Sequence, residues 1–237
     1  MTSYSEFAKF YDAAMGDMSG KIDFLHKLLK ESAPDAKTLL EFASGTGTIL
    51  EGLSSGYKVS GVDLSEKMAE IAKKKLPSAD IRVGDMTNYD FGKTFDIVLC
   101  AYDSINHLQN WEQWCALFAN ADRHLQSDGI FIFDFNTIKR LEWLSDNPPF
   151  GRLLGDDYMF MDIKSEDGRF VWDVRVFEKE PDDRFALHED LIHEISFPVN
   201  QVTDEVAKSF TIEKIVDAKD LDEENPNWRP FLVCRKK

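Results

Sequence analysis

A run of small residues follows an apolar segment at the point where a strand would give way to a helix. It reads Leu39-Leu-Glu-Phe-Ala-Ser-Gly-Thr-Gly-Thr48. Small side chains let the backbone approach a ligand closely, and the unpaired amide groups at a helix start attract negative charge. The pattern therefore indicates a ligand-binding turn, although an ordinary tight turn between a strand and a helix uses similar residues.

Three acidic residues, Glu41, Asp63 and Asp85, fall at the carboxyl ends of three successive predicted strands. Open α/β sheets bind their ligands at this edge. Asp63 is placed to accept both hydroxyls of a ribose, and Asp85 to accept from the exocyclic amine of an adenine. Either aspartate alone could be a helix cap, but three acids in this order predict a nucleoside-binding site.

Other nucleotide motifs fit less well. Gly45-Thr-Gly-Thr-Ile-Leu50 departs from the G-x-G-x-x-G dinucleotide fingerprint, because Leu50 stands where a small residue packs a helix against its strand. The sequence also has no G-x-x-x-x-G-K-[ST] phosphate-binding loop. A nicotinamide-dependent oxidoreductase is therefore the less favoured interpretation, and an ATP site of the phosphate-loop type is not indicated.

Predicted strands and helices alternate along the first 137 residues and would position these side chains. Apolar runs that hardly alternate predict strands covered on both faces, which is typical of a parallel sheet. These runs are Thr38–Phe42, Lys58–Val62, Ile81–Val83, Phe95–Ala101 and Ile130–Asp134. The predicted helices, each with an apolar face, are Ile22–Leu29, Ser65–Lys75 and Trp111–Leu125. This succession predicts a doubly wound α/β fold.

The pattern changes after Pro148-Pro149. Alternation of apolar and polar side chains then predicts an antiparallel sheet with one solvated face and a hairpin turn at Glu166–Arg169. Its predicted strands are 158–163, 170–177 and 187–197. Two further strands follow, Phe210–Val216 and Phe231–Arg235, separated by an acidic loop, Asp217–Pro230. The antiparallel sheet is therefore predicted to be an insertion in the α/β domain.

Charge and composition limit which classes of binding partner the protein is expected to have. The 237 residues contain 28 Lys and Arg against 43 Asp and Glu, which gives a net charge of −15. A nucleic-acid partner is disfavoured, since such binders need a positive face. No apolar run reaches the ~20 residues of a membrane span, and the first residues lack the basic and apolar regions of an export signal. With three widely spaced cysteines, these features favour a cytoplasmic protein.

Taken together, the motifs resemble those of the class I S-adenosylmethionine-dependent methyltransferases. Glu41–Gly47 is similar to their glycine-rich first motif, Asp63 to their ribose acid, and Gly84–Met86 to their adenine-contacting motif. Phe95–His107 is similar to the motif of their fourth strand. The segment Tyr4–Asp12 resembles that of a small-molecule subgroup with an antiparallel sheet inserted after the fifth strand, which includes N-methyltransferases of amino sugars and amino acids.

The resemblance implies a Rossmann-like, doubly wound seven-stranded sheet whose last strand is antiparallel. Residues 1–147 and 198–237 would bind S-adenosylmethionine, and residues 148–197 would form an inserted antiparallel sheet that caps the acceptor side. The implied reaction moves a methyl group to a small-molecule acceptor, with an amine and an oxygen both open as the methylated atom. The alternative is a non-catalytic regulatory module that binds S-adenosylmethionine or a nucleotide. A metal site is not expected, and both a monomer and a homodimer fit.

The resemblance also assigns cofactor-binding residues. Gly45 would pass beneath the methionyl part, Tyr11 would close over it, and the carbonyl of Ala101 would lie near its amino group. The full set is Tyr11, Glu41, Ala43, Ser44, Gly45, Asp63, Leu64, Asp85, Met86 and Ala101. Ala43 departs from the family, in which most members have glycine at this position. A methyl group is expected to fit there if the backbone φ is negative.

The general base is sought among the histidines, because imidazole titrates in the required range. His107 follows the fourth strand on the ligand side and is the first candidate, with a packing or capping role as the alternative. Tyr102 and Asp103 are alternatives for orienting the acceptor. Thirteen acids and five bases between Gly155 and Glu194 leave −8 on the inserted sheet. These acidic residues could simply form a solvated face, or they could attract a cationic acceptor. The apolar face at Phe170, Trp172 and Val174 could also serve dimerisation.

Overall fold

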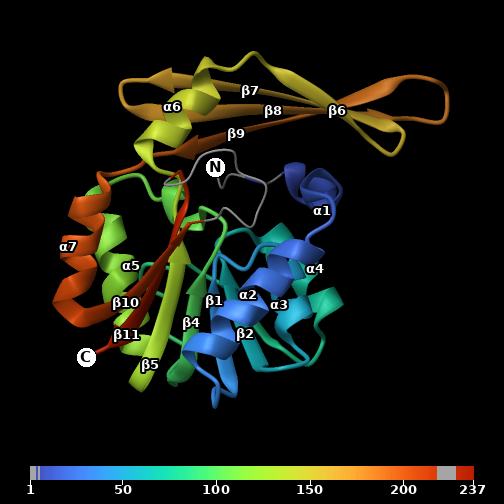
Figure 1. The fold of residues 1–237 in the computed structure, drawn as a ribbon. Helices are drawn as coiled ribbons and strands as arrows, with labels where there is room; N and C mark the ends of the chain where they lie inside the picture. Colours follow the sequence, from blue (N-terminus) through green and yellow to red (C-terminus); the bar gives the residue numbers. More distant parts are fainter. Residues whose placement is uncertain (1–3, 5, 218–227) are drawn as a thin grey trace.

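The larger of two sheets has seven strands in the order β10-β11-β5-β4-β1-β2-β3. This computed structural model describes residue 4, residues 6–217 and residues 228–237 (Figure 1). The strands are β1 Thr38–Phe42, β2 Lys58–Asp63, β3 Asp80–Val83, β4 Phe95–Cys100, β5 Leu125–Asp134, β10 Phe210–Asp217 and β11 Pro230–Lys236. Only β11 runs antiparallel to its neighbours, β5 and β10. The predicted doubly wound sheet with a reversed last strand is confirmed.

Helices cover both faces of this sheet because its strands are apolar on both sides. Leu39 and Leu40 are both fully buried, yet they belong to the cores on opposite faces. The helices α2 Ser19–Ser32, α3 Thr48–Leu53 and α4 Glu66–Lys75 pack on one face. The helices α5 Trp111–His124 and α7 Val199–Ser209 pack on the other (Figure 1).

The second sheet has four antiparallel strands in the order β6-β7-β8-β9 and lies across the carboxyl edge of the first (Figure 1). Its strands are β6 Phe150–Leu154, β7 Asp157–Glu166, β8 Arg169–Lys179 and β9 Phe185–Glu194. The expected hairpin is present: Glu166 pairs with Arg169 across a turn in which Asp167 and Gly168 have positive φ. Strand β6 and helix α6, Ile138–Asp146, lie outside the predicted elements.

Several predicted boundaries shift. The helix predicted at Ile22–Leu29 extends over Ser19–Ser32, and the strand predicted from Ile130 already begins at Leu125. Of the acidic loop predicted at Asp217–Pro230, residues 218–227 lie outside the described residues. In the part of the chain that is described, no helix is both long and apolar enough to cross a membrane.

The N-terminal segment covers the inner face of the four-stranded sheet. Phe7 and Phe10, in the 3₁₀ helix Phe7–Phe10, pack in one cluster with Val174 and Val176 of β8. The next helix, α1 Tyr11–Met15, continues along the same side. Part of the apolar face that could serve dimerisation is therefore covered within the chain: Val174 belongs to this cluster, and the partly buried Trp172 packs against it.

Candidate active site

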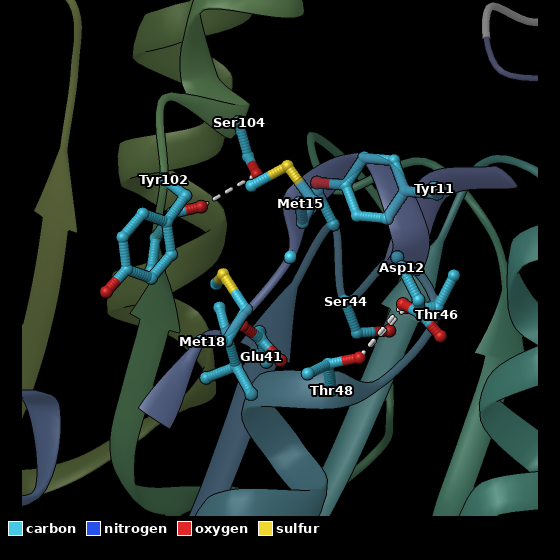
Figure 2. Close-up of a pocket in the computed structure, with 15 residues that line it drawn as sticks. Tyr11, Asp12, Met15, Met18, Glu41, Ser44, Thr46, Thr48, Tyr102 and Ser104 are labelled. Carbon is cyan, nitrogen blue, oxygen red and sulfur yellow. Dashed lines mark hydrogen bonds between the residues drawn. The ribbon is translucent and has the colours of Figure 1, made fainter. Parts of the chain in front are cut away.

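Three adjoining cavities open at the carboxyl ends of β1, β2 and β4, beneath the four-stranded sheet. Ala43 and Ser104 line all three. One surrounds the turn after β1 (Figure 2), and a second, of about 600 Å³, lies at the ends of β2 and β3. The third, of about 310 Å³, lies against the four-stranded sheet. All eleven residues predicted to bind the cofactor or catalyse line at least one of these cavities.

Glycines shape the turn between β1 and α3. Gly45 has φ +53°, and a side chain added there would meet no atom within 4 Å, so the cavity side of the turn is open. Gly47 has φ +79°, and a Cβ there would approach the Cβ of Ala72 in α4 to 3.0 Å. Because glycine adopts positive φ without steric cost, these two positions allow the chain to turn tightly.

The condition under which a methyl group would fit at position 43, a negative φ, is not met. The φ of Ala43 is +53°, in the left-handed region, so its methyl group is strained there. The left-handed conformation costs an L-residue about 1–2 kcal/mol, whereas glycine adopts it freely. Local sequence does not determine this φ: the next residue, Ser44, donates its N–H to the carbonyl of Val62, and this bond orients the turn.

We expect Ala43→Gly to raise the free energy of unfolding by about 0.5–1 kcal/mol, since the relieved strain exceeds the added chain entropy. Urea denaturation measures this change. The same substitution at Ala207, an exposed position inside helix α7, should instead lower stability by up to about 1 kcal/mol. If both variants lose stability alike, the alanine at 43 is not strained.

Asp63 joins the glycine turn to the end of β2. Its two carboxylate oxygens accept from the backbone N–H of Gly45 at 2.7 Å and of Ser65 at 2.8 Å. Burial raises the pKa of this carboxyl above its usual value, although both hydrogen bonds oppose the shift. Each oxygen keeps a lone pair, so Asp63 can still accept hydroxyl groups from a ligand in the cavities that it lines.

Asp85 lines the 600 Å³ cavity together with Leu64 and Met86. One of its oxygens accepts from the backbone N–H and the hydroxyl of Thr87, at 2.8 and 2.7 Å, which fixes the carboxylate. Met86 is buried, whereas Leu64 exposes 57% of its surface although it is apolar. A carboxylate beside two apolar side chains can bind a flat ring that carries an amine donor.

Glu41, Tyr11 and Ala101 line the first cavity (Figure 2). Glu41 is 2% exposed, and among the described residues its Oε2 has no hydrogen-bond partner; burial raises its pKa well above the usual value. Ser104 donates its hydroxyl to the carbonyl of Ala101, which leaves that oxygen one lone pair. A buried carboxylate oxygen without a partner fits a ligand that brings a donor or a positive charge.

A hydrogen-bond network attaches helix α1 to the glycine turn. Asp12 accepts from the hydroxyl of Thr46 at 2.5 Å and that of Thr48 at 3.1 Å, and pairs with Lys75 at 2.6 Å. The neighbouring Tyr11 is thereby held over the first cavity (Figure 2). Sequence reasoning used Tyr11 but missed this network, whose signal was the pair of threonines within the glycine turn.

His107 lies between the two larger cavities, but both its ring nitrogens are engaged. Nε2 is 3.2 Å from the hydroxyl of Tyr4, and Nδ1 is 3.4 Å from the carbonyl of His193. Burial lowers the pKa of the imidazole, so it is neutral near pH 7. Among the described residues no cluster of three or more His, Cys, Asp or Glu side chains could hold a metal ion.

A charged group lies beside His107, and sequence reasoning named only its Asp103. Asp103, Asn136, Glu194 and Arg229 line the 310 Å³ cavity. Glu194 is the one buried acid among the thirteen of the inserted sheet, so most of the acidic excess is a solvated surface and a single carboxylate reaches the cavity. The sequence does hold a sign of this: side chains alternate between the two faces along β9, so Glu194 shares the inward face with Ile192.

The comparisons with known proteins agree with this architecture. Residues 39–129 match a family model described as a methyltransferase domain. A curated relative is the dTDP-3-amino-3,4,6-trideoxy-alpha-D-glucopyranose N,N-dimethyltransferase of Streptomyces venezuelae, 29% identical over 68% of this chain and 64% of the relative. Another is the dTDP-4-amino-2,3,4,6-tetradeoxy-D-glucose N,N-dimethyltransferase of Saccharopolyspora spinosa, 31% identical over 54% of each chain. The matches thus span about half to two thirds of these relatives.

A solved structure has the same fold as this chain. The crystal structure of an S-adenosylmethionine-dependent methyltransferase from Clostridium acetobutylicum superposes with a TM-score of 0.85, covering 98% of both chains at 22% identity. The sheet order, the glycine turn and the acids at the ends of β1 to β3 define a Rossmann-like methyltransferase fold. Residues 39–129 thus match a methyltransferase domain, and the whole chain has the fold of an S-adenosylmethionine-dependent methyltransferase.

Proposed function

We propose that this chain transfers the methyl group of S-adenosylmethionine to an amine nitrogen of a small molecule, and that amino sugars are its acceptor class. One observation carries the proposal. The 310 Å³ cavity is lined both by the glycine turn, at Gly45 and Asp63, and by the carboxylates of Asp103 and Glu194. An amine between these groups would lie beside the cofactor and beside two carboxyl groups that can accept its N–H groups.

The residues present fit the cofactor. Asp63 would hold the ribose, Asp85 the adenine amine, and the unpartnered oxygen of Glu41 the positively charged methionyl end. Leu64 and Met86 would contact the ring. Bound there, S-adenosylmethionine supplies a methyl group that its sulfonium has already activated, so positioning and exclusion of water remain for the protein.

Residues 148–197 would act as the acceptor-side cap. Val174 and Ile192 of its strands pack on the N-terminal Phe7 and Phe10, while Trp172 and Met161 face the cavity. This arrangement encloses the acceptor between the sheet and the glycine turn. The names of the two curated relatives, both dimethyltransferases of amino sugars, support an acceptor of this class.

The test is direct. The purified protein is incubated with S-adenosylmethionine and dTDP-3-amino-3,4,6-trideoxy-α-D-glucopyranose, and products are identified by mass spectrometry. We expect mono- and dimethylated amine. dTDP-glucose, which carries hydroxyls alone, is the matched control and should stay unmethylated. Methylation of the hydroxyl sugar, or no product with a panel of amino sugars, amino acids and peptides, would contradict the amine acceptor.

A further inference from the structure

Glu194 is a carboxylate at the end of β9 that points into the interior. It is 3% exposed and lines the 310 Å³ cavity. Its side chain makes one hydrogen bond within the described residues: Oε2 accepts from the amide Nδ2 of Asn136 at 3.1 Å. Burying a carboxylate with so few partners is costly, so the position needs a further partner or a proton.

Asn136 provides independent evidence of a missing donor. Its Nδ2 donates to Glu194 and, at 2.6 Å, to Asp103. Because carboxylates only accept, the amide nitrogen must face them and the amide oxygen must point away. That oxygen is buried and has no partner among the described residues, and Asn136 lines the same cavity. An unpaired buried acceptor lowers stability, and a ligand with an N–H group would recover that loss.

The charges around Glu194 come from several elements. Asp103, which precedes the 3₁₀ helix Ser104–His107, is paired with Arg229, so its charge is balanced locally. Burial first, and then Asp103, raise the pKa of Glu194 to about 8, while Asn136, Arg229 and Arg140 oppose the shift. On the N-terminal side the phenol of Tyr4 faces the same group, and its own pKa is raised. Glu194 can therefore exchange a proton near neutral pH.

We propose that Glu194 and the amide oxygen of Asn136 bind the ammonium group of the acceptor, and that Glu194 takes the proton which the nitrogen must lose before methyl transfer. This inference rests on the proposed function. Two of the three N–H groups of an ammonium would meet these two acceptors. One proton passes to the carboxylate, which becomes a carboxylic acid, and the nitrogen keeps the electron pair that forms the new N–C bond. The C–S bond breaks, and its pair stays on sulfur as a neutral thioether.

Glu194 is better placed for this step than His107. The hydroxyl of Tyr4 and the carbonyl of His193 occupy the two ring nitrogens of that histidine, so its basic lone pair is not directed at the cavity. A matched pKa favours proton transfer between an amine and a buried carboxylate. His107 then serves to position Tyr4 at the cavity wall.

The test uses Glu194→Gln, which keeps the shape and removes the charge. Sinefungin and S-adenosylhomocysteine are the probes, because sinefungin carries an amine on the carbon that replaces the methylated sulfur. Calorimetry should show that the variant binds S-adenosylhomocysteine as the wild type does but binds sinefungin at least about 5-fold more weakly. This readout needs no acceptor. Glu189→Gln, at an exposed position of the same strand, should change neither affinity.

Turnover supplies the second readout. With the amino-sugar probe at pH 7, Glu194→Gln should lower kcat/KM by about 100-fold, and the gap should close near pH 10, where the free amine predominates. A structural role would not produce this convergence. An unchanged ratio of sinefungin to S-adenosylhomocysteine affinity overturns the assignment of Glu194, whatever the acceptor. If wild type fails to methylate the probe but the ratio falls, the proposed amino-sugar substrate fails and the role of Glu194 stands.

Discussion

Replacing Asp63 with alanine is expected to weaken the binding of S-adenosylhomocysteine by at least about 100-fold. Hydrogen bonds to a charged group contribute about 1.5–3 kcal/mol each, and the substitution removes those that the ribose would make. It also releases the backbone N–H of Gly45, which Asp63 holds at 2.7 Å, so the glycine turn loses its anchor. Both effects act in the same direction. Titration calorimetry measures the loss.

The control is Asp80→Ala, at the opposite end of the adjacent strand β3, where the carboxylate pairs with Arg82 and Lys93 at the surface. Its affinity should stay within about twofold of wild type, since exposed pairs contribute little. NADH is the second control and should not bind, because the turn lacks the dinucleotide fingerprint. Saturable NADH binding, or an Asp63 variant that binds S-adenosylhomocysteine normally, would refute the cofactor site.

Wild-type affinity should also depend on pH through Asp63. Burial raises the pKa of this carboxyl, so on acidification it takes a proton at a higher pH than an ordinary aspartate. The protonated form loses the charge that strengthens its bonds to the ribose hydroxyls. Affinity should therefore fall as the pH decreases, and the fall should be absent in the alanine variant.

The cofactor half of the site was predictable because it is local in sequence. The turn after β1 and the acids at 63 and 85 each lie at the end of a recognisable strand, and parallel strands bring their carboxyl ends to one edge. The conformation of Ala43 was not predictable, since its φ depends on a hydrogen bond between Ser44, in the turn after β1, and Val62 of the adjacent strand β2. Strand β6 escaped prediction because its Phe150, Arg152 and Leu153 are exposed and do not alternate.

The acceptor half depends on contacts between distant segments. Asn136 meets Glu194 across 58 positions and Asp103 across 33, and these separations follow only from the sheet order. Composition suggested a broad acidic face, whereas the fold buries one of these acids, Glu194, and leaves the others exposed or half-buried. The alternation of side chains along β9 could have identified Glu194 as an inward residue. Nothing in the nearby sequence identifies Asn136, the asparagine that orients it.

Replacing Arg229 with methionine is expected to lower the free energy of unfolding by about 3–5 kcal/mol. Its guanidinium pairs with Asp103 and lies 2.9 Å from Asp134, which is fully buried. Asp134 also accepts the backbone N–H of Tyr102 at 2.5 Å, so the pair attaches the start of β11 to the segment after β4. Methionine fills the volume but leaves a buried carboxylate without its cation. Urea denaturation measures the change.

The matched control is Arg175→Met. Arg175 also pairs with two carboxylates, Asp173 at 2.7 Å and Glu189 at 3.3 Å, but its side chain is 43% exposed. Water replaces the lost interactions there, so the cost should be below about 1 kcal/mol. Equal losses in the two variants would mean that burial of the carboxylates is not what makes Arg229 important.

The loss in Arg229→Met should also grow with pH. Burial raises the pKa of Asp134 to about 7, and Arg229 opposes that shift. A carboxyl whose folded pKa is raised favours the folded state when it is protonated, and this contribution is lost as the pH rises from about 4 to about 7. Without the guanidinium the pKa rises further. At pH 5 the folded carboxyl is protonated in both proteins and needs no cation, whereas at pH 8 the variant must keep a proton that the wild type releases. The destabilisation measured at pH 8 should therefore exceed that at pH 5, and the opposite order would show that the arginine stabilises the fold by packing rather than by charge.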